Sequence, residues 1–299
     1  MRVFDIGANL TDPMFQGIYN GKQKHVPDLV NVLRRSTQCH ISDIMVTAGC
    51  EEDLGQSISL ITSHPIKEIK LSTTVGIHPT QAAGKTAQHF DALHQIFHST
   101  HAGVIRAIGE CGLDYDRLEH ANKQEQLWVF EEHLKRAHQF NNLPFFFHLR
   151  NAFDDFYELL SKYRSSISGG VVHSFDGTVE EARKLIDLDL FIGLNGCSLK
   201  ATVELAREIP LERLMVESDA PWCSIKATSP ATPFLTMPLP FQSGGNKWNE
   251  ESGLKGRNEP WAAYQVLQVI ANTRQLPIED VAEVIYSNSY KMFGSSINN

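Results

Sequence analysis

Residues 104–116 read VIRAIGECGLDYD, an apolar run followed by two acidic side chains. The segment from Val104 to Ile108 has the composition of a buried strand, and Glu110 and Asp114 come just after it. A buried strand does not need carboxylates at its end, whereas a metal ion, or a phosphate held by one, does. The two acids could instead cap the helix that follows. On this stretch alone, both interpretations stay open.

Similar apolar runs alternate with helical stretches along the chain. This alternation predicts a parallel sheet, and eight strands are the number that closes a (β/α)8 TIM barrel, here a single domain over residues 1–299. An open doubly wound α/β sheet is the alternative, but no GxGxxG sequence follows the first strand, which removes the commonest use of that fold. The predicted strands are 2–6, 43–47, 71–76, 104–109, 144–148, 169–173, 189–194 and 213–218. The predicted helices are 25–37, 51–63, 87–100, 120–141, 151–164, 178–187, 199–208, 260–274 and 278–293.

Polar residues follow the ends of most predicted strands. In a barrel these ends lie on one rim, where the loops after the strands build active sites. Two carboxylates and two imidazoles among them suit Mg²⁺, Mn²⁺ or Zn²⁺ and exclude a thiolate-based structural zinc site. Glu110, on a central strand, is predicted to bridge two ions, as in phosphodiester hydrolysis. The strand-end residues are Gly7, Asn9, His78, Glu110, His148, His173, Asn195 and Asp219, and the predicted metal ligands among them are Glu110, His148, His173 and Asp219.

The segment 222–258, here called the rim loop, breaks the alternation. It is proline- and glycine-rich without helical periodicity, and it is too long for an ordinary connection, so we expect it to cover the rim. Its four basic and two acidic residues give it a net charge of +2, and it carries four large aromatic side chains. Such a loop could bind a nucleic-acid strand by stacking and phosphate contacts, with Trp222 next to the metal site. Alternatively, its aromatic residues merely pack on the barrel.

Composition narrows the classes of function. The net charge of -8 excludes a large basic face for coating duplex DNA, so a nucleic-acid substrate would have to be held locally. Five cysteines without CxxC spacing suggest reduced thiols inside the cell, and Cys111 and Cys197 are expected to be inert. The amino terminus does not read as a signal peptide and no apolar run is long enough to span a membrane, so we expect a nuclear or cytoplasmic protein. No membrane association or obligate protein partner is indicated.

Seven motifs occur in order along the chain: DIGANLTDPMFQGIY (5–19), VGIHP (75–79), IGECGLDYDR (108–117), FFHLRNA (146–152), VVHSFDG (171–177), VESDAPW (216–222) and RNEP (257–260). Together they resemble the TatD family of metal-dependent deoxyribonucleases, and most of all its eukaryotic members. The resemblance covers essentially the whole chain. It implies a TIM barrel of the metal-dependent hydrolase superfamily that acts on DNA with a divalent cation.

Carried over position by position, the resemblance implies a role for each site residue. Glu110 would bridge two metals, His148 and His173 would hold one of them, and Asp219 would complete the other and take the proton of the attacking water. His78 would lie beside the scissile phosphate. Arg257 would hold the last barrel helix together with its RNEP neighbours, or would contact a phosphate. The predicted substrate-binding residues are Asn9, His78, Trp222 and Arg257.

The chain departs from the family pattern at its start. Many relatives begin with an HxH pair that ligates the first metal, and here those positions are Gly7 and Asn9. The loss of two imidazoles implies a loosely bound first metal and favours Mg²⁺ or Mn²⁺ over Zn²⁺.

The leading hypothesis is therefore a two-metal deoxyribonuclease, working 3′→5′ on single strands or frayed ends of DNA. A barrel hydrolase of a small amide, lactone or phosphoester is the first alternative. A nucleic-acid-binding barrel that has lost its chemistry is the second. Hydrolysis of end-labelled DNA with Mg²⁺, with and without EDTA, separates all three.

Overall fold

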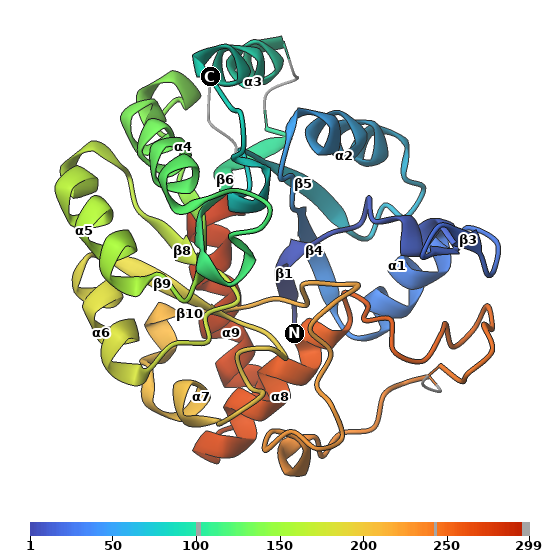
Figure 1. Ribbon diagram of the computed structural model, residues 1–299. Helices are drawn as coiled ribbons and strands as arrows, with labels where there is room; N and C mark the ends of the chain where they lie inside the picture. Colours follow the sequence, from blue (N-terminus) through green and yellow to red (C-terminus); the bar gives the residue numbers. More distant parts are fainter. Residues whose placement is uncertain (100–102, 242–243, 295–299) are drawn as a thin grey trace.

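Eight parallel strands form a nearly closed barrel with helices around it, as Figure 1 shows, which confirms the predicted TIM-barrel fold. The computed structural model describes residues 1–99, 103–241 and 244–294. Neighbouring strands in the sheet follow one another in the sequence. They are β1 (Val3–Ala8), β4 (Ile41–Val46), β5 (Lys70–Val75), β6 (Ile105–Asp114), β7 (Phe145–Arg150), β8 (Gly170–Val172), β9 (Leu190–Leu194) and β10 (Leu214–Val216).

Strand β6 is longer than predicted, because pairing with β7 resumes beyond an irregularity between Ile108 and Cys111 and continues to Asp114. The prediction that the strand ends at residue 109 is therefore wrong, and Glu110 and Asp114 both lie within it. Gly112 has φ +146°, and a Cβ there would overlap the carbonyl oxygen of His148. Glycine at this position lets β6 approach β7 closely, which brings their side chains together at the rim.

The first and last strands meet at the carboxyl end of the barrel. The amide of Asp219 donates to the carbonyl of Gly7 at 2.8 Å, and the amide of Asn9 donates to the carbonyl of Ala220 at 2.7 Å. These bonds form a seam between β1 and the segment after β10. The seam therefore includes residues of the predicted active site.

The barrel interior holds apolar side chains from most of the strands, including Phe4, Met45, Phe146 and Met215. Tyr286 and Phe293, near the carboxyl terminus, pack against this group. The larger apolar cluster includes residues of the strands and of the surrounding helices. The interior is thus a packed core, and not a pore.

Most helices lie close to their predicted positions, but the helix expected over 199–208 begins only at Glu204. Asn122 and Thr178 start two of them with capping boxes, in which each cap exchanges hydrogen bonds with a glutamate three residues later. The helix expected over 120–141 ends at Lys135, and residue 100 of the one expected over 87–100 lies outside the described residues. The helices are α1 (Leu29–Gln38), α2 (Glu51–Ser63), α3 (Ala87–Ser99), α4 (Lys123–Lys135), α5 (Phe153–Tyr163), α6 (Val179–Asp187), α7 (Glu204–Glu208), α8 (Ala262–Arg274) and α9 (Ile278–Ser289).

The rim loop runs from the site to α8, and its described part packs on the amino-terminal region. Trp248 stacks on His25 with ring centroids 5.2 Å apart, and its indole donates to Asp28 at 2.8 Å. Phe241 meets Trp261 edge-on, and Phe234 is partly buried. These contacts fit the packing interpretation of the loop. Residues 242 and 243 of the loop lie outside the described part.

Trp222 differs from the other rim-loop aromatics, because 49% of its surface is exposed. Among the helices that the structure describes, none is long and apolar enough to cross a membrane.

Candidate active site

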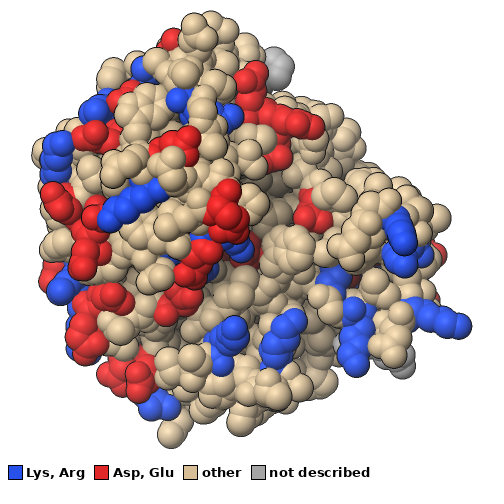
Figure 2. All heavy atoms as spheres, viewed as in Figure 1, with Lys and Arg blue, Asp and Glu red and all other residues tan. Residues whose placement is uncertain are grey.

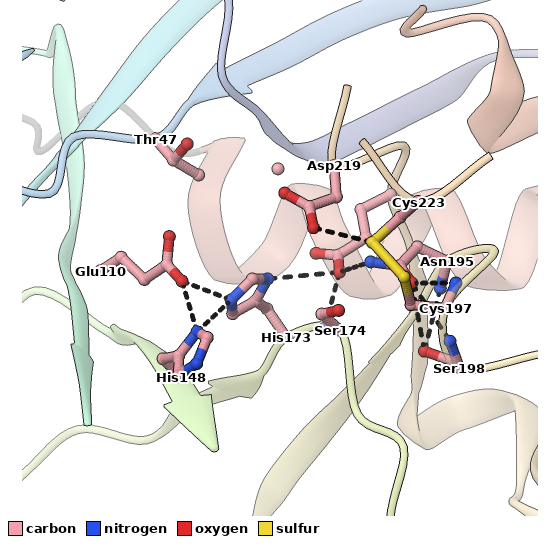
Figure 3. Close-up of polar contacts among 12 residues, drawn as sticks. Thr47, Glu110, His148, His173, Ser174, Asn195, Cys197, Ser198, Asp219 and Cys223 are labelled. Carbon is pink, nitrogen blue, oxygen red and sulfur yellow. Dashed lines mark hydrogen bonds and ion pairs between the residues drawn. A yellow bond between two sulfur atoms is a disulfide. The ribbon is translucent and has the colours of Figure 1, made fainter. Parts of the chain in front are cut away.

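One carboxylate oxygen lies at the centre of the rim (Figure 3). Oε1 of Glu110 is 2.6 Å from Nδ1 of His148, 2.7 Å from Nε2 of His173 and 3.3 Å from Nε2 of His78. The ligand atoms of His78, Glu110 and His148 all lie within 4.8 Å of one another. Three imidazole nitrogens around one carboxylate oxygen form a set that can hold a divalent cation. The sequence predicted three of these four residues as ligands, and His78 as a neighbour.

Charge complementarity holds this cluster together. Burial alone would raise the pKa of Glu110, but the nearby histidines, His173 first among them, hold it well below its ordinary value. Burial acts to lower the pKa of His173, yet Glu110 and Glu217 raise it well above the usual range. Glu110 is therefore anionic, as a metal ligand must be, and a cation arriving at His173 displaces a proton.

Two further carboxylates, which the sequence interpretation did not assign to the site, hold the histidines from behind. Oδ2 of Asp114 is 3.1 Å from Nε2 of His148, and Oε1 of Glu217 is 3.3 Å from Nδ1 of His173. Both acids have fully buried side chains. A carboxylate on the second ring nitrogen fixes the tautomer and orientation of a ligating histidine. Asp114 also orders the turn that follows β6, because it accepts from the amide of Asp116.

The sequence contained a signal for both acids. Asp114 is four residues beyond Glu110 on β6, and Glu217 is two residues before Asp219. Each stands at a strand end next to a predicted ligand. The signal was missed because Asp114 was expected in a loop, and because Glu217 was counted as part of a buried strand.

Asp219 lies across the rim from His148, at the seam. Its Oδ1 accepts a hydrogen bond from the side-chain amide of Asn9, Nδ2, at 2.9 Å. Oδ1 of Asn9 in turn accepts from the hydroxyl of Thr47 at 2.6 Å. Burial, together with the negative charges of Glu217 and Glu110, raises the pKa of Asp219 to about 7. A carboxylate with this pKa can accept a proton near neutral pH. Asn9 therefore orients Asp219, a contact that the prediction of a substrate-binding role did not anticipate.

His78 is held by its own turn. Its Nδ1 is 2.7 Å from the hydroxyl of Thr80, which leaves Nε2 facing Glu110. Burial lowers the pKa of His78, although Glu110 opposes this effect. The imidazole is thus suited to a neutral role, either as a metal ligand or as a donor to a phosphate oxygen.

The position of the missing first histidine is filled by a carboxylate. A Cβ placed on Gly7 would lie 2.9 Å from Oε2 of Glu217 and 2.9 Å from the ring of Phe146. That Oε2 atom is buried and has no hydrogen-bond partner. The donors present therefore suit a hard divalent cation on the Glu110 side, while the HxH side offers carboxylates and an amide instead of imidazoles.

Arg257 does not fit a substrate-binding role. Its side chain is fully buried, and its guanidinium pairs with Asp28 at 2.7 Å and with Glu259 at 2.8 Å. Glu259 also pairs with Arg35 at 2.8 Å. This buried network connects α1 to the segment before α8, so Arg257 holds the fold together and is not available to a phosphate. The structural role considered for the RNEP motif is the one that the contacts support.

The cysteines also differ from the expectation of five reduced thiols. Cys197, in the loop after β9, and Cys223, in the rim loop, form a disulfide with a Cα–Cα distance of 4.9 Å. Cys39, Cys50 and Cys111 are free thiols. The sequence gave no reason to pair Cys197 with Cys223, because 26 residues separate them and only the barrel brings their loops together.

Comparisons with known proteins agree with this geometry. The family model described as TatD related DNase matches residues 4–294. The Deoxyribonuclease Tat-D of Schizosaccharomyces pombe is 37% identical to the chain, covering 98% of it and 96% of the relative. A more distant relative, the 3′-5′ ssDNA/RNA exonuclease TatD of Pantoea ananatis, is 28% identical over 98% of this chain and 99% of its own length.

A solved structure shows the same fold. The crystal structure of a hydrolase TatD family protein from Entamoeba histolytica superposes with a TM-score of 0.91 at 33% identity and covers 98% of each chain. The family model and the eukaryotic relative span nearly the whole chain, including every residue of the cluster around Glu110. The chain therefore belongs to the TatD family of deoxyribonucleases.

Proposed function

We propose that the protein is a divalent-metal-dependent deoxyribonuclease that removes nucleotides from the 3′ end of single-stranded or frayed DNA. The observation that carries this proposal is the grouping of His78, His148 and His173 around Oε1 of Glu110, at the rim of the barrel. Asp219, with a pKa of about 7, belongs to the same buried site. Metal ligands and a proton acceptor together are what phosphodiester hydrolysis requires.

Each residue has a defined task in this reaction. A bound divalent cation would polarise the phosphodiester and lower the pKa of a bound water. Glu110, His148 and His173 would hold the cation, and Asp114 and Glu217 would keep the two imidazoles oriented. Asp219, oriented by Asn9, takes the proton of the attacking water. His78 binds the scissile phosphate or completes the ligand set.

Surface charge supports an approach from the rim-loop side. Figure 2 shows Lys and Arg side chains over the lower right of the rim face, where Figure 1 places the rim loop and the hairpin of β2 (Ile18–Tyr19) and β3 (Lys22–Gln23). Most of the Asp and Glu side chains in this view lie on the left half, with Lys and Arg among them. A cavity of about 670 Å³ on the acidic side is lined by residues that include Asp116, Asp154 and Asp176. A strand that contacts the lysines and stacks on Trp222 would reach the metal site without crossing these acids.

The preference for 3′ ends and single strands rests on the bacterial relative named as a 3′-5′ ssDNA/RNA exonuclease. The test uses single-stranded DNA labelled at its 5′ end, incubated with Mg²⁺ or Mn²⁺. A ladder of shortened labelled fragments, absent with EDTA, is the expected result. Release of the 5′ label as a mononucleotide from the start of the reaction would contradict the direction. An intact oligonucleotide under all metal conditions would contradict the activity.

Two ions bridged by Glu110 remain our proposal for the metal content, with Mg²⁺ or Mn²⁺ favoured over Zn²⁺ because Gly7 and Asn9 supply no imidazole. A crystal soaked in Mn²⁺ and measured by anomalous scattering would count the ions. Two peaks beside Glu110 are expected. A nuclear or cytoplasmic location likewise remains a proposal, which a fluorescent fusion would test.

A further inference from the structure

The disulfide between Cys197 and Cys223 joins two loops that both support the site (Figure 3). Cys197 follows β9 and Cys223 follows β10 by seven residues. A Cβ on Gly196 would overlap the carbonyl oxygen of Cys223 and lie 2.7 Å from the amide of Ile225. Glycine at position 196 therefore allows the close approach that brings the two sulfur atoms together.

One end of the disulfide leads to His173. The amide of Cys197 donates to Oδ1 of Asn195 at 2.8 Å, and Nδ2 of Asn195 donates to Oε1 of Glu217 at 3.0 Å. That same carboxylate oxygen lies 3.3 Å from Nδ1 of His173. The three supporting side chains are buried or half-buried, so a shift of Cys197 is transmitted to the ring of a proposed metal ligand.

The other end leads to Asp219. Sγ of Cys223 lies 3.1 Å from Oδ2 of Asp219. A disulfide sulfur carries no hydrogen and cannot donate, whereas a reduced Cys223 would donate its S–H to this carboxylate. Reduction therefore does two things at once: it releases the cross-link between the two supports and it changes the contact of a site carboxylate.

We propose that Cys197 and Cys223 are a reversible thiol–disulfide modification site that sets the metal affinity of the active site. The inference rests on the metal site of the proposed function. The disulfide links the loop of Asn195, which contacts Glu217 behind His173, to the loop of Cys223, which contacts Asp219. The oxidised protein therefore holds its metal-binding side chains in place before a cation arrives. Reduction frees the two loops from each other and lowers the affinity of the site for a divalent cation.

The chemistry balances with a low-molecular-weight disulfide as the oxidant. The two thiols lose two protons and two electrons as the S–S bond forms, and oxidised glutathione takes up both and becomes two molecules of reduced glutathione. Excess reduced glutathione reverses the exchange. Cys197 and Cys223 are half-buried and so within reach of a small thiol, whereas Cys39 and Cys111 are buried.

The test uses the whole protein, equilibrated with oxidised or reduced glutathione and then freed of it under nitrogen. Alkylation after denaturation, followed by intact mass, counts the free thiols, and calorimetric titration of the folded protein with Mn²⁺ alone measures metal affinity. We expect three free thiols after oxidation, those of Cys39, Cys50 and Cys111, and all five after reduction. We expect the oxidised form to bind Mn²⁺ about tenfold more tightly.

Three variants sharpen the result. Cys197→Ala keeps the Cys223 thiol beside Asp219, and Cys223→Ser keeps a donor there, but neither can form the bridge. Both are expected to show the affinity of the reduced protein whatever the glutathione ratio. Cys50→Ser, which removes a half-buried thiol outside the pair, is the matched control and should retain the full response.

Five free thiols at every glutathione ratio, or equal Mn²⁺ affinity in the two redox states, would overturn the inference. The outcome is independent of nuclease activity. If DNA is not cleaved while Mn²⁺ affinity follows the redox state, the proposed nuclease function fails and the redox inference stands. If DNA is cleaved while the Mn²⁺ affinity is the same in both redox states, the redox inference fails and the proposed nuclease function stands.

Discussion

At the scale of single residues, the site is a set of acids and imidazoles in which each buried charge lies next to a group of opposite charge. Glu110 is buried, and it stays anionic because three imidazoles surround it. Asp114 and Glu217 repeat the arrangement behind His148 and His173. Removing one member leaves its partners buried without compensation, which is costlier than losing an exposed contact.

The first prediction concerns Glu110 and Asp219, the two carboxylates proposed to act directly in the reaction. Glu110→Ala and Asp219→Ala should each reduce DNA hydrolysis by about a hundredfold or more, because the first removes a metal ligand and the second removes the proton acceptor. Turnover of labelled single-stranded DNA at saturating Mg²⁺ measures the effect, with circular dichroism to verify folding. Glu119→Ala, an exposed carboxylate in the loop after β6, is the control. Near-native turnover in either site variant would show that the assignment is wrong.

At the scale of elements, the candidate site is shared between strands and loops, because Glu110 and His148 lie within β6 and β7 whereas Asp219 lies in the segment after β10. The rim loop is divided, because Trp248 and Phe241 pack on neighbouring elements while Trp222 stays exposed next to Asp219. The two interpretations of this loop therefore apply to different parts of it.

Trp222 provides the second prediction. Trp222→Ala should weaken binding of a single-stranded 3′ end by about 1–3 kcal/mol, the value of one stacked base, and should weaken binding of a blunt duplex less. Metal affinity should hardly change. Both DNA affinities can be measured in Ca²⁺, which is expected to permit binding without cleavage. Trp128→Ala, an exposed tryptophan on α4, is the control. Equal losses on the two DNAs would leave Trp222 as a packing residue.

A histidine on α4 gives a prediction about pH. Burial lowers the pKa of His133 to about 4, and its Nε2 accepts from the amide of Ile77 at 3.1 Å. An unfolded histidine titrates near 6.5, so between these pH values only the unfolded chain binds the proton. The contribution of His133 therefore lowers the free energy of unfolding as the pH decreases from about 6.5, and by about 2 kcal/mol at pH 5.

Urea unfolding at pH 7 and pH 5 measures this contribution. His133→Gln should lower stability at pH 7 and shrink the difference between the two pH values by about 2 kcal/mol. The exposed His138, changed to Gln, should leave that difference unaltered. The prediction is wrong if the His133 variant keeps the full pH difference.

At the scale of the whole molecule, charge limits how DNA can bind. The net charge of -8 repels a polyanion, and the rim loop offers less than its sequence suggested, because Arg257 is neutralised by Asp28 and Glu259. Lys226, Lys247 and Lys255 remain exposed in the loop, against Glu250 and Glu251. Few phosphates can therefore be neutralised.

The fourth prediction follows from this balance. A plot of log affinity for single-stranded DNA against log salt concentration should be shallow, with a slope of about -1.5 to -3, which corresponds to two to four phosphates. Affinities measured in Ca²⁺ over a range of NaCl concentrations test it. A slope steeper than about -5 would require a basic surface that the described residues do not supply.

Most of the fold was predictable, because the spacing of apolar residues and the local composition indicate where most strands and helices lie. The long β6 was not, since its irregularity at Gly109–Glu110 interrupts the apolar pattern that signals a strand. Glu110, His148 and His173 were predictable because each comes at the end of an apolar run in the sequence. The burial of Arg257 and the Cys197–Cys223 disulfide were not predictable, because each depends on which loops the closed barrel brings side by side.

The seam between β1 and the segment after β10 has a consequence for the growing chain. Asn9 and Asp219 are 210 residues apart, so the amino-terminal half of the site leaves the ribosome long before its partner. At about 5–20 residues per second, the delay is about 10–40 s. During that interval β1 can pair with β4, but Asn9 has no Asp219 to orient. A nascent chain is thus without a complete site until the segment after its last strand emerges, when more than two thirds of the protein has already been made.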